Sequence, residues 1–262
     1  MLLAIDVGNT NTVFAVLSGE DVCGEWRSAT TDLRTADEYA VWLTQLMQIN
    51  GITPAQINGV IVSTVVPQTL FELRVLCHKY FSGEPLVVGE DGVKTGLTIM
   101  LDRPEQVGAD RLVNAVAAHK AHPGLDLVVI DFGTATTFDV VSAEGEYRGG
   151  IIAPGVNLSI QALHDAAAKL PHIVVRRPDK VIGTDTVSAM QSGVYWGYIG
   201  LIEGIVSRIA EEYGRSMTVV STGGLGHLLR HGTPVITHFD PDLTIRGLAE
   251  IYRRNCATGT SL

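Results

Sequence analysis

Cysteine is scarce in this chain of 262 residues, which contains only 3: Cys23, Cys77 and Cys256. A small odd number without a CxxC pair excludes a disulfide framework and a cysteine-based zinc site, and it is typical of a reducing compartment. A basic excess is also missing, because the formal net charge is -9. Proteins that bind nucleic acid usually carry a basic face, so we expect no nucleic acid partner.

Targeting and membrane segments are missing as well. The chain begins Met1-Leu2-Leu3-Ala4, with no basic region and no apolar run of signal-peptide length. The most apolar long stretch, 187–210, is interrupted by Gln191, Glu203 and Arg208. It therefore predicts a buried helix rather than a membrane span. We expect a cytoplasmic protein with no membrane partner.

The common nucleotide-binding motifs are absent too. There is no GxxxxGK[ST] loop and no GxGxxG between a strand and a helix. Asp131-Phe132-Gly133 matches the kinase DFG motif in letters only, because it lies in a predicted hairpin. Any nucleotide site must therefore be built in another way.

An internal repeat is the most informative feature that is present. The apolar run at 2–5 leads into Asp6-Val7-Gly8-Asn9-Thr10-Asn11-Thr12, and the run at 127–130 leads into Asp131-Phe132-Gly133-Thr134-Ala135-Thr136-Thr137. The two aspartates, the two glycines and the final threonines are each 125 residues apart, as are Gly24 and Gly149. Each copy reads as strand, tight turn and strand, so the repeat predicts two homologous domains that each open with a β-hairpin.

A second match extends the repeat. The segment 60–64 resembles 219–222, with Ser63-Thr64 aligned to Ser221-Thr222 at an offset of 158. The second half therefore carries about 33 extra residues before this strand. We predict an α/β protein of two duplicated domains with mixed β-sheets flanked by helices and a cleft between them. The expected boundaries are 1–120 for the first lobe, 121–255 for the second, and 256–262 for a flexible tail.

Three helices are predicted with distinct features. Thr35 and Glu38 form a capping box before an apolar face, a second helix begins near Gly108, and a third covers about 186–212. Glycines on one face of the third helix imply close approach by another backbone, either within the fold or across a dimer interface. The sequence leaves both explanations open. The glycines are Gly193, Gly197, Gly200 and Gly204.

The acidic turns suggest a phosphate site. Gly8 would allow a positive φ, so that neighbouring amides and the hydroxyls of Thr10 and Thr12 point at phosphate oxygens. Asp6 could hold Mg²⁺ through water. An ordinary hairpin turn would also explain this segment on its own. The second copy favours a site in which two acidic turns grip one polyphosphate and its cation.

Paired acidic turns on duplicated α/β domains resemble the actin, Hsp70 and sugar-kinase superfamily. Within that superfamily, the chain is similar to the type III pantothenate kinase family over nearly its whole length. The matching segments are Asp6-Val7-Gly8-Asn9-Thr10, Gly108-Ala109-Asp110-Arg111, Asp131-Phe132-Gly133-Thr134-Ala135-Thr136, Gly149-Gly150-Ile151-Ile152-Ala153-Pro154-Gly155, Gly183-Thr184-Asp185-Thr186 and Ser221-Thr222-Gly223-Gly224. The resemblance implies ATP-dependent phosphorylation of pantothenate in coenzyme A biosynthesis, by an enzyme that is typically a homodimer.

The resemblance also implies roles for residues. ATP would be bound by Asp6, Val7, Gly8, Asn9, Thr10, Asn11, Thr12, Val13, Thr134, Gly223 and Gly224. Pantothenate would be bound by Gly108, Ala109, Asp110, Arg111 and Thr186, with Asp110 as the catalytic base. Asp6 would serve Mg²⁺, and Asp131 would hold a monovalent cation, K⁺ or NH₄⁺. At a helix start, the dipole would favour the ionised form of Asp110. A solvated helix start is the alternative reading of Asp110 and Arg111.

One position departs from the family pattern. Many members carry a tyrosine seven residues before the glycine of the GADR segment, and this chain has Leu101 there. Two rival functions remain open from the sequence: another small-molecule kinase of the same superfamily, and a non-enzymatic regulatory relative. The presence of Asp110, Asp131 and Thr186 favours the enzyme.

Overall fold

The computed structural model describes residues 1–81, 83–167 and 170–256 of the chain, and these form two compact units. The first unit comprises 1–98, 102–120 and the C-terminal segment from Asp242, and the second comprises 99–101 and 121–241. The helix α7 (Leu243–Cys256) thus belongs with the first unit. The sequence had placed the chain up to 255 in the second lobe. From residue 257 onward, the predicted tail lies outside the described residues.

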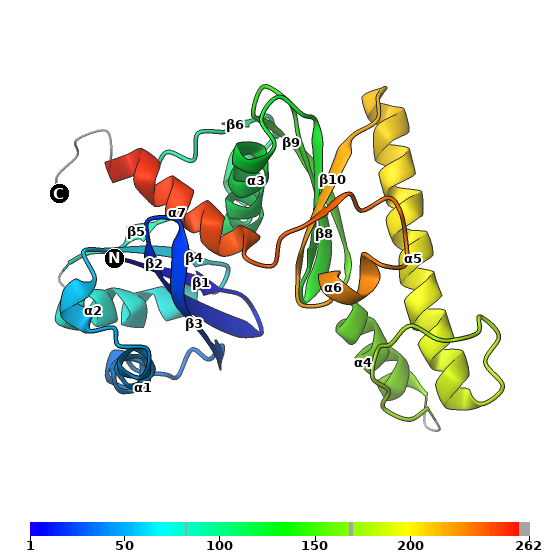
Figure 1. Cartoon of the computed structure of the whole chain (residues 1–262), viewed down its shortest axis with the longest axis horizontal. Helices are drawn as coiled ribbons and strands as arrows, with labels where there is room; N and C mark the ends of the chain where they lie inside the picture. The colour runs from blue at the N-terminus through cyan, green and yellow to red at the C-terminus, as the bar shows by residue number, and fades with distance from the viewer. Residues whose placement is uncertain (82, 168–169, 257–262) are drawn as a thin grey trace. The chain divides into compact units, whose positions relative to one another are not determined.

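The first unit is built on a five-stranded sheet in the order β3-β2-β1-β4-β5. Its strands are β1 (Leu2–Val7), β2 (Asn11–Ser18), β3 (Asp21–Ala29), β4 (Gly59–Thr64) and β5 (Leu86–Val87). β1 pairs antiparallel with β2 and parallel with β4. In Figure 1, α1 (Ala36–Ile49) and α2 (Leu70–Tyr80) lie below this sheet, and α7 lies above it.

Both faces of the first sheet are covered because its side chains alternate between two apolar clusters. Leu3, Ile5 and Val7 pack with residues of α1 and α2, whereas Ala4 packs with Val113 and Leu248, which come from α3 (Ala109–Ala121) and α7. Successive strand residues point to opposite faces, so this sheet is buried on both sides.

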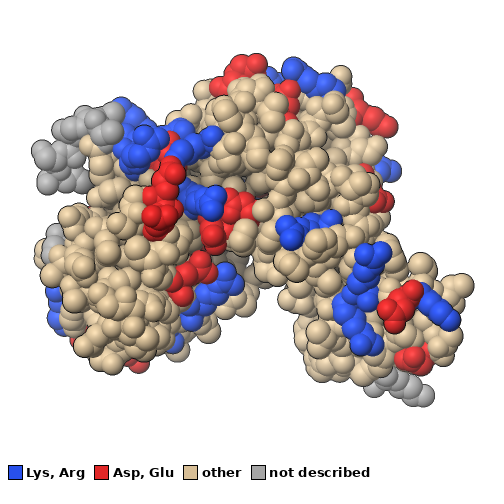
Figure 2. All heavy atoms as spheres, in the orientation of Figure 1, with Lys and Arg blue, Asp and Glu red and all other residues tan. Residues whose placement is uncertain are grey.

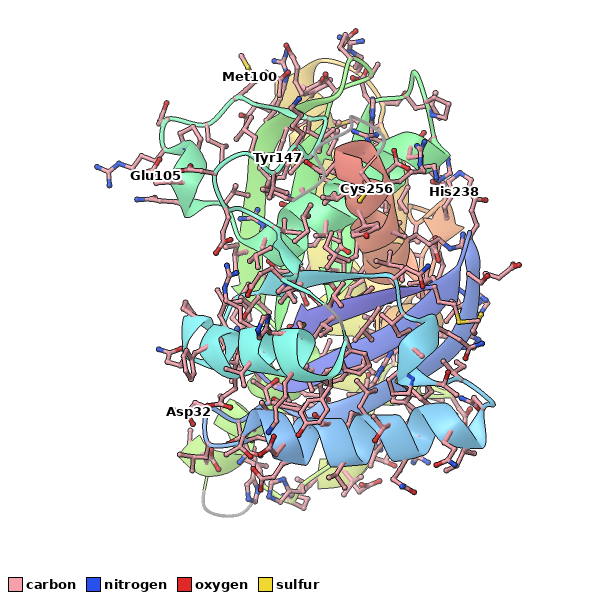
Figure 3. The ribbon with its side chains drawn as sticks, turned by 90° about the vertical axis from the view of Figure 1, so that its left-hand side faces the viewer. Asp32, Met100, Glu105, Tyr147, His238 and Cys256 are labelled. Atoms are coloured by element: carbon pink, nitrogen blue, oxygen red, sulfur yellow. The ribbon has the colours of Figure 1, made fainter. Side chains whose placement is uncertain are left out.

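The second unit contains a six-stranded sheet in the order β11-β10-β7-β8-β9-β6. The strands are β6 (Thr98–Ile99), β7 (Leu127–Phe132), β8 (Ala135–Val141), β9 (Glu146–Pro154), β10 (Thr218–Gly223) and β11 (His238–Phe239). Its helices are α4 (Val156–Ala166), α5 (Thr186–Tyr213) and the short α6 (Gly226–Leu229). At the edge of this sheet the backbone N–H of Met100 donates to the carbonyl of Tyr147 at 2.8 Å (Figure 3).

The two sheets are copies of one another, as the repeat predicted. β3-β2-β1-β4-β5 matches β9-β8-β7-β10-β11 in order, and the first hairpin of each is followed by a strand with the same irregularity. Gly24 pairs with Val16, Gly149 pairs with Val140, and the register shifts directly after each pair. A bulge kept at equivalent places in both sheets confirms the duplication.

The three predicted helices are confirmed, and the glycine face of the third is exposed. Thr35 and Glu38 form the capping box of α1. The glycine face of α5 is uncovered: a β-carbon at Gly193, Gly197 or Gly200 would meet no heavy atom of the described residues within 4 Å, apart from its own helix backbone. Close packing inside the described chain therefore does not explain this face.

On the surface shown in Figure 2, Lys and Arg side chains are interspersed with Asp and Glu. Among the described residues, no helix combines the length and the apolar character that crossing a membrane requires.

Candidate active site

The first acidic turn joins β1 to β2 and is closed by its own backbone. The N–H of Gly8 donates to the carbonyl of Asn11 at 3.0 Å, and Thr10 accepts from the N–H of Thr30 at 3.0 Å. Asn9, Thr10 and Asn11 are exposed. The turn is therefore fixed at both ends, with its tip open to a ligand.

A hydroxyl relay supports this turn from beneath. The Oγ1 atoms of the buried Thr12 and the half-buried Thr30 are 2.9 Å apart, and the Thr30 hydroxyl donates to the carbonyl of Gly8 at 2.7 Å. Thr30 was not among the predicted site residues. Its only sequence signal is its place directly after the strand β3.

The structure corrects the reason given for Gly8. Gly8 is not among the glycines with positive φ, and neither is Gly133. Glycine is favoured at residue 8 by space instead, because a β-carbon there would lie 3.2 Å from the carbonyl oxygen of Asn11. The turn is tight, and it does not need a left-handed residue at this position.

The second acidic turn joins β7 to β8 and is one residue shorter. Val7 pairs with Thr12 in the first hairpin, and Phe132 pairs with Thr136 in the second. Thr136, rather than Thr137, therefore stands at the position of Thr12. The N–H of Gly133 donates to Ala135 at 3.0 Å, and the exposed Thr134 accepts from the N–H of Gly155 at 3.1 Å.

The second turn lacks the hydroxyl relay of the first. Gly155 stands where Thr30 stands in the first copy, and a β-carbon on it would lie 2.2 Å from the carbonyl oxygen of Thr134. Without a hydroxyl there, the buried Oγ1 of Thr136 has no hydrogen-bond partner within the described residues. The two turns are thus alike in backbone and different in the chemistry beneath.

The two aspartates occupy equivalent strand ends. Asp6 is beside Ser63 in the parallel pair β1–β4, and Asp131 is beside Thr222 in the parallel pair β7–β10. The equivalent of Ser63 is therefore Thr222, one residue later than the sequence alignment placed it. Carboxyl ends of neighbouring parallel strands are where open α/β sheets bind ligands.

Glycine at position 223 leaves room for the carboxylate of Asp131. Gly223 has φ +89°, and a β-carbon on it would lie 2.6 Å from the Oδ1 atom of Asp131. At Gly133 a β-carbon would lie 3.8 Å from the same atom. This cradle fits a cation held by one carboxylate and backbone oxygens.

Preformed metal cages are not found: in the described part of the chain, no group of three or more His, Cys, Asp or Glu side chains could hold a metal ion. Mg²⁺ in nucleotide sites is usually held by one or two carboxylates, water and substrate phosphates. A single Asp6 at a strand end fits that donor set.

The predicted catalytic base begins α3. The carbonyl of Gly108 accepts from the N–H of Leu112 at 3.2 Å, and the N–H of Arg111 donates to Oδ1 of Asp110 at 2.8 Å. Burial raises the pKa of Asp110, and the Arg111 N–H and guanidinium oppose that rise. The expectation that the helix start would favour the ionised form is thus outweighed by desolvation.

Asp6 and α3 belong to the same face of the first sheet. Asp6 alternates with Val7 and so points to the side of Ala4, which packs with Val113 of α3. The first turn and the segment Gly108–Arg111 are therefore parts of one unit.

Thr186 is exposed and is the first residue of α5. Its position is fixed by the N-cap Asp185, which accepts from the N–H of Ser188 at 3.0 Å. Leu101, the departure from the family pattern, packs beside Gly149, where a β-carbon would lie 3.3 Å from its Cδ2 atom. Gly224 follows the end of β10, and a β-carbon placed there would meet no described heavy atom within 4 Å apart from its own chain neighbours.

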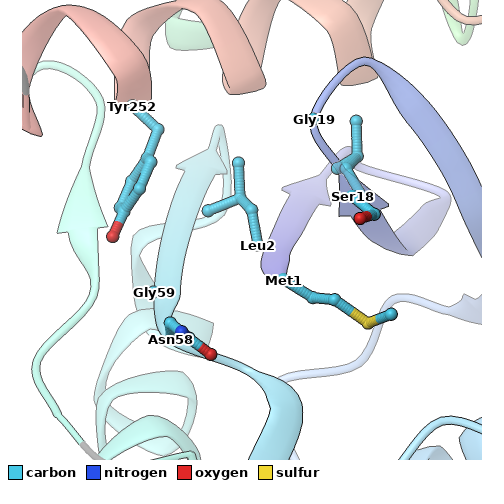
Figure 4. A pocket seen from close by; sticks show the side chains of 8 residues that line it. Met1, Leu2, Ser18, Gly19, Asn58, Gly59 and Tyr252 are labelled. Atoms are coloured by element: carbon cyan, nitrogen blue, oxygen red, sulfur yellow. The ribbon is translucent and has the colours of Figure 1, made fainter.

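A separate pocket of about 270 Å³ lies at the opposite end of the first sheet (Figure 4). It is lined by Met1, Leu2, Leu17, Ser18, Gly19, Asn58, Gly59 and Tyr252. Leu2 is four residues from Asp6 along an extended strand, about 13 Å. This pocket is therefore not part of the acidic-turn site.

Comparison of the sequence with known proteins shows which family it matches. The model for the type III pantothenate kinase family matches residues 2–208. A type III pantothenate kinase from Paramagnetospirillum magneticum is 62% identical over 255 residues, which covers 97% of this chain and 98% of the relative.

Solved structures share the fold. A protein from Campylobacter jejuni described as a Baf family transcriptional activator has a TM-score of 0.62 at 19% identity, and the match covers 97% of this chain and 99% of that one. A ROK hexokinase from Thermus thermophilus has a TM-score of 0.50 at 13% identity, with 98% and 99% covered. At these identities the likeness is one of fold, and it agrees with the predicted α/β fold with mixed sheets flanked by helices.

Proposed function

The chain belongs to the type III pantothenate kinase family, and from this we propose how its own residues carry out the family's reaction. It is a kinase that phosphorylates pantothenate with ATP in coenzyme A biosynthesis. The observation that carries the proposal is the pair of equivalent acidic turns, at Asp6 and Asp131, each with amides closing a tight hairpin.

We propose that both turns bind phosphate groups of one ATP molecule. The residues would be Asp6, Val7, Gly8, Asn9, Thr10, Asn11, Thr12 and Val13 in the first turn, and Thr134 in the second. Gly223 and Gly224 would approach the adenosine. The chain is acidic overall, so local amides and cations must supply the attraction for a triphosphate.

Asp110 acts on the acceptor. A carboxylate oxygen of Asp110 accepts the proton of the primary hydroxyl of pantothenate as the new O–P bond forms and the bond from the γ-phosphorus to ADP breaks. The raised pKa of Asp110 moves it toward the range in which a general base is effective. Phosphoryl transfer has a loose transition state, so orienting the hydroxyl is the larger part of this role.

The remaining contacts to pantothenate come from the same helix start and from α5. Gly108 and Ala109 shape the backbone beside Asp110, and the guanidinium of Arg111 is suited to the carboxylate of pantothenate. Thr186, exposed at the start of α5, donates or accepts through its hydroxyl.

Two cations complete the proposal. Asp6 would hold Mg²⁺ through water, and Asp131, in its glycine cradle, would hold K⁺ or NH₄⁺. Bound there, these ions would offset negative charge on the triphosphate.

We further propose a cytoplasmic homodimer. The uncovered glycine face of α5 supports a dimer, because glycines cost stability in a helix unless another backbone approaches them closely.

The experiment is a substrate panel with the purified protein, Mg²⁺, K⁺ and ATP. Pantothenate, hexoses, acetate and polyphosphate are each supplied, and the products are identified by mass spectrometry. We expect 4'-phosphopantothenate and one ADP per product. Consumption of ATP with another member of the panel alone, or with none, would refute the assignment.

A further inference from the structure

Arg34 lies in the loop between β3 and α1, which runs beside the first acidic turn. This loop, marked by Asp32 in Figure 3, begins with Thr30, whose N–H and hydroxyl bind the carbonyls of Thr10 and Gly8. Arg34 is four residues further on and directly precedes the N-cap Thr35. The loop therefore joins the turn to a basic side chain within one unit.

The guanidinium of Arg34 has an enclosed N–H group without an acceptor. Its Nη1 atom is buried and has no hydrogen-bond partner within the described residues. Its central carbon lies 5.2 Å from the ring centroid of Tyr39, which is itself 1% exposed. Buried charged donors are nearly always paired, so an unpaired one indicates a missing acceptor.

A second polar atom at the same place is also unpaired. The hydroxyl of Tyr39 is buried with no hydrogen-bond partner in the described chain. Burial raises the pKa of Tyr39, and the neighbouring charge of Arg34 and side chain of Thr12 oppose that rise. Arg34 and Tyr39 thus bring two unsatisfied groups to the residue that supports the turn.

Glu38, an acidic side chain close to Arg34, is already engaged. Its Oε2 atom accepts from the N–H of Thr35 at 2.8 Å and from the Thr35 hydroxyl at 2.9 Å. The capping box of α1 therefore uses the carboxylate that would otherwise pair with the guanidinium. Within the described residues, no acceptor pairs with the Nη1 atom of Arg34.

We propose that Arg34 is a further ATP-binding residue, whose guanidinium donates to polyphosphate oxygens when the nucleotide occupies the turn at Gly8–Asn11. The assignment rests on the proposed function of that turn. Arginine suits the role because its planar donors match phosphate oxygens in pairs.

The test measures nucleotide affinity by calorimetry for wild type, Arg34→Gln, Arg34→Lys and Lys79→Gln, with ATP and with adenosine. Lys79 is the matched control: it is 53% exposed, pairs with Asp37 of α1, and loses the same charge. We expect Arg34→Gln to weaken ATP binding roughly tenfold or more, with adenosine affected less. Arg34→Lys should fall between, and Lys79→Gln should match wild type.

Two outcomes would overturn the assignment. The first is unchanged ATP affinity in folded Arg34→Gln. The second is an equal loss of affinity for ATP and for adenosine, which would mean that Arg34 only supports Tyr39. If Arg34→Gln does not fold, unchanged ATP affinity in Arg34→Lys overturns it instead. If wild type itself bound no ATP, the function proposed for the turn would fail as well, so the two failures can be told apart.

Discussion

Gly108 lies against the carboxylate of Asp110: a β-carbon on residue 108 would be 2.5 Å from the Oδ1 atom of Asp110. The same Oδ1 accepts the N–H of Arg111, so the carboxylate is held between two backbone groups. The glycine of the GADR segment therefore leaves the space in which the proposed base sits.

Gly108→Ala should displace that carboxylate. We expect kcat for pantothenate phosphorylation to fall about 10- to 100-fold, because a misplaced catalytic group loses rate steeply. ATP affinity should remain within about twofold, since the nucleotide turn is not touched. Steady-state kinetics and calorimetry measure the two quantities, and a wild-type kcat in Gly108→Ala would contradict the proposed geometry.

Asp110→Asn should lower the turnover rate and raise the thermal stability of the protein. Turnover should fall by roughly 10² to 10⁴, the usual contribution of a general base. Burial raises the pKa of Asp110 in the folded protein. The folded state therefore loses stability as the pH rises from the ordinary aspartate pKa through this raised value, because the buried carboxyl must ionise. The variant lacks that loss, so its Tm at pH 7 should exceed that of wild type.

The control for this variant is Asp102→Asn, the same change at an exposed position eight residues upstream. It should leave rate and Tm unchanged. In wild type, kcat/KM should decline on acidification at a pH above the ordinary pKa of aspartate. Full turnover in Asp110→Asn would remove Asp110 from the mechanism.

Potassium dependence follows from the carboxylate cradle at Asp131. Activity should be lost when sodium or tetramethylammonium replaces K⁺, and it should return with NH₄⁺. Asp131→Asn should weaken the response to K⁺. Assays at constant ionic strength test this, and equal rates in sodium and potassium buffers would argue that Asp131 has a different role.

The glycine face of α5 predicts a dimer that is sensitive to side-chain size. Gly197→Gln should shift the protein toward monomers in sedimentation velocity, because a long side chain prevents close backbone approach. Val41→Gln, on the exposed surface of α1, introduces the same side chain elsewhere and should not change the assembly. A wild-type protein that sediments as a monomer would contradict the dimer proposal.

Glu250 should make the fold acid-sensitive. Burial alone would raise its pKa, but hydrogen bonds from Arg254, Arg253 and Lys120 outweigh this and lower it to about 2. The pair with Lys120, at 3.1 Å, joins α7 to the end of α3, and the pair with Arg254, at 2.6 Å, lies within α7.

A depressed pKa stabilises the fold above the unfolded value of 4.5, and that stability is lost as pH falls from there toward 2. The shift corresponds to roughly 3 kcal/mol at neutral pH. Glu250→Gln should therefore lower the free energy of unfolding by about that amount. Glu20→Gln removes an exposed partner of the same Lys120 and should cost less than about 1 kcal/mol.

Features that depend on short sequence patterns were predicted correctly. The duplicated hairpins, the capping box at Thr35 and the extent of α5 followed from local signals, and the structure confirms them. The strand register was not predicted correctly. The second turn is shorter, so Thr136 rather than Thr137 occupies the position of Thr12. Beside Asp131 stands Thr222 rather than Ser221. One-residue shifts of this kind depend on strand pairing, which a sequence alignment does not show.

Tertiary features were also missed for physical reasons. The return of α7 to the first unit depends on packing against β1 and α3, over a long separation in sequence. The raised pKa of Asp110 depends on burial, which the helix-start argument did not include. Thr30 and Arg34 carry no motif, and only their places beside the first turn distinguish them.

The central claim is that two acidic turns serve one nucleotide. A crystal structure with a non-hydrolysable ATP analogue, Mg²⁺, K⁺ and pantothenate tests it most directly. The account predicts triphosphate oxygens within hydrogen-bond distance of amides in both 8–11 and 133–135, with the pantothenate hydroxyl at Asp110. A triphosphate bound to one turn alone, with the other far from any ligand atom, would contradict it.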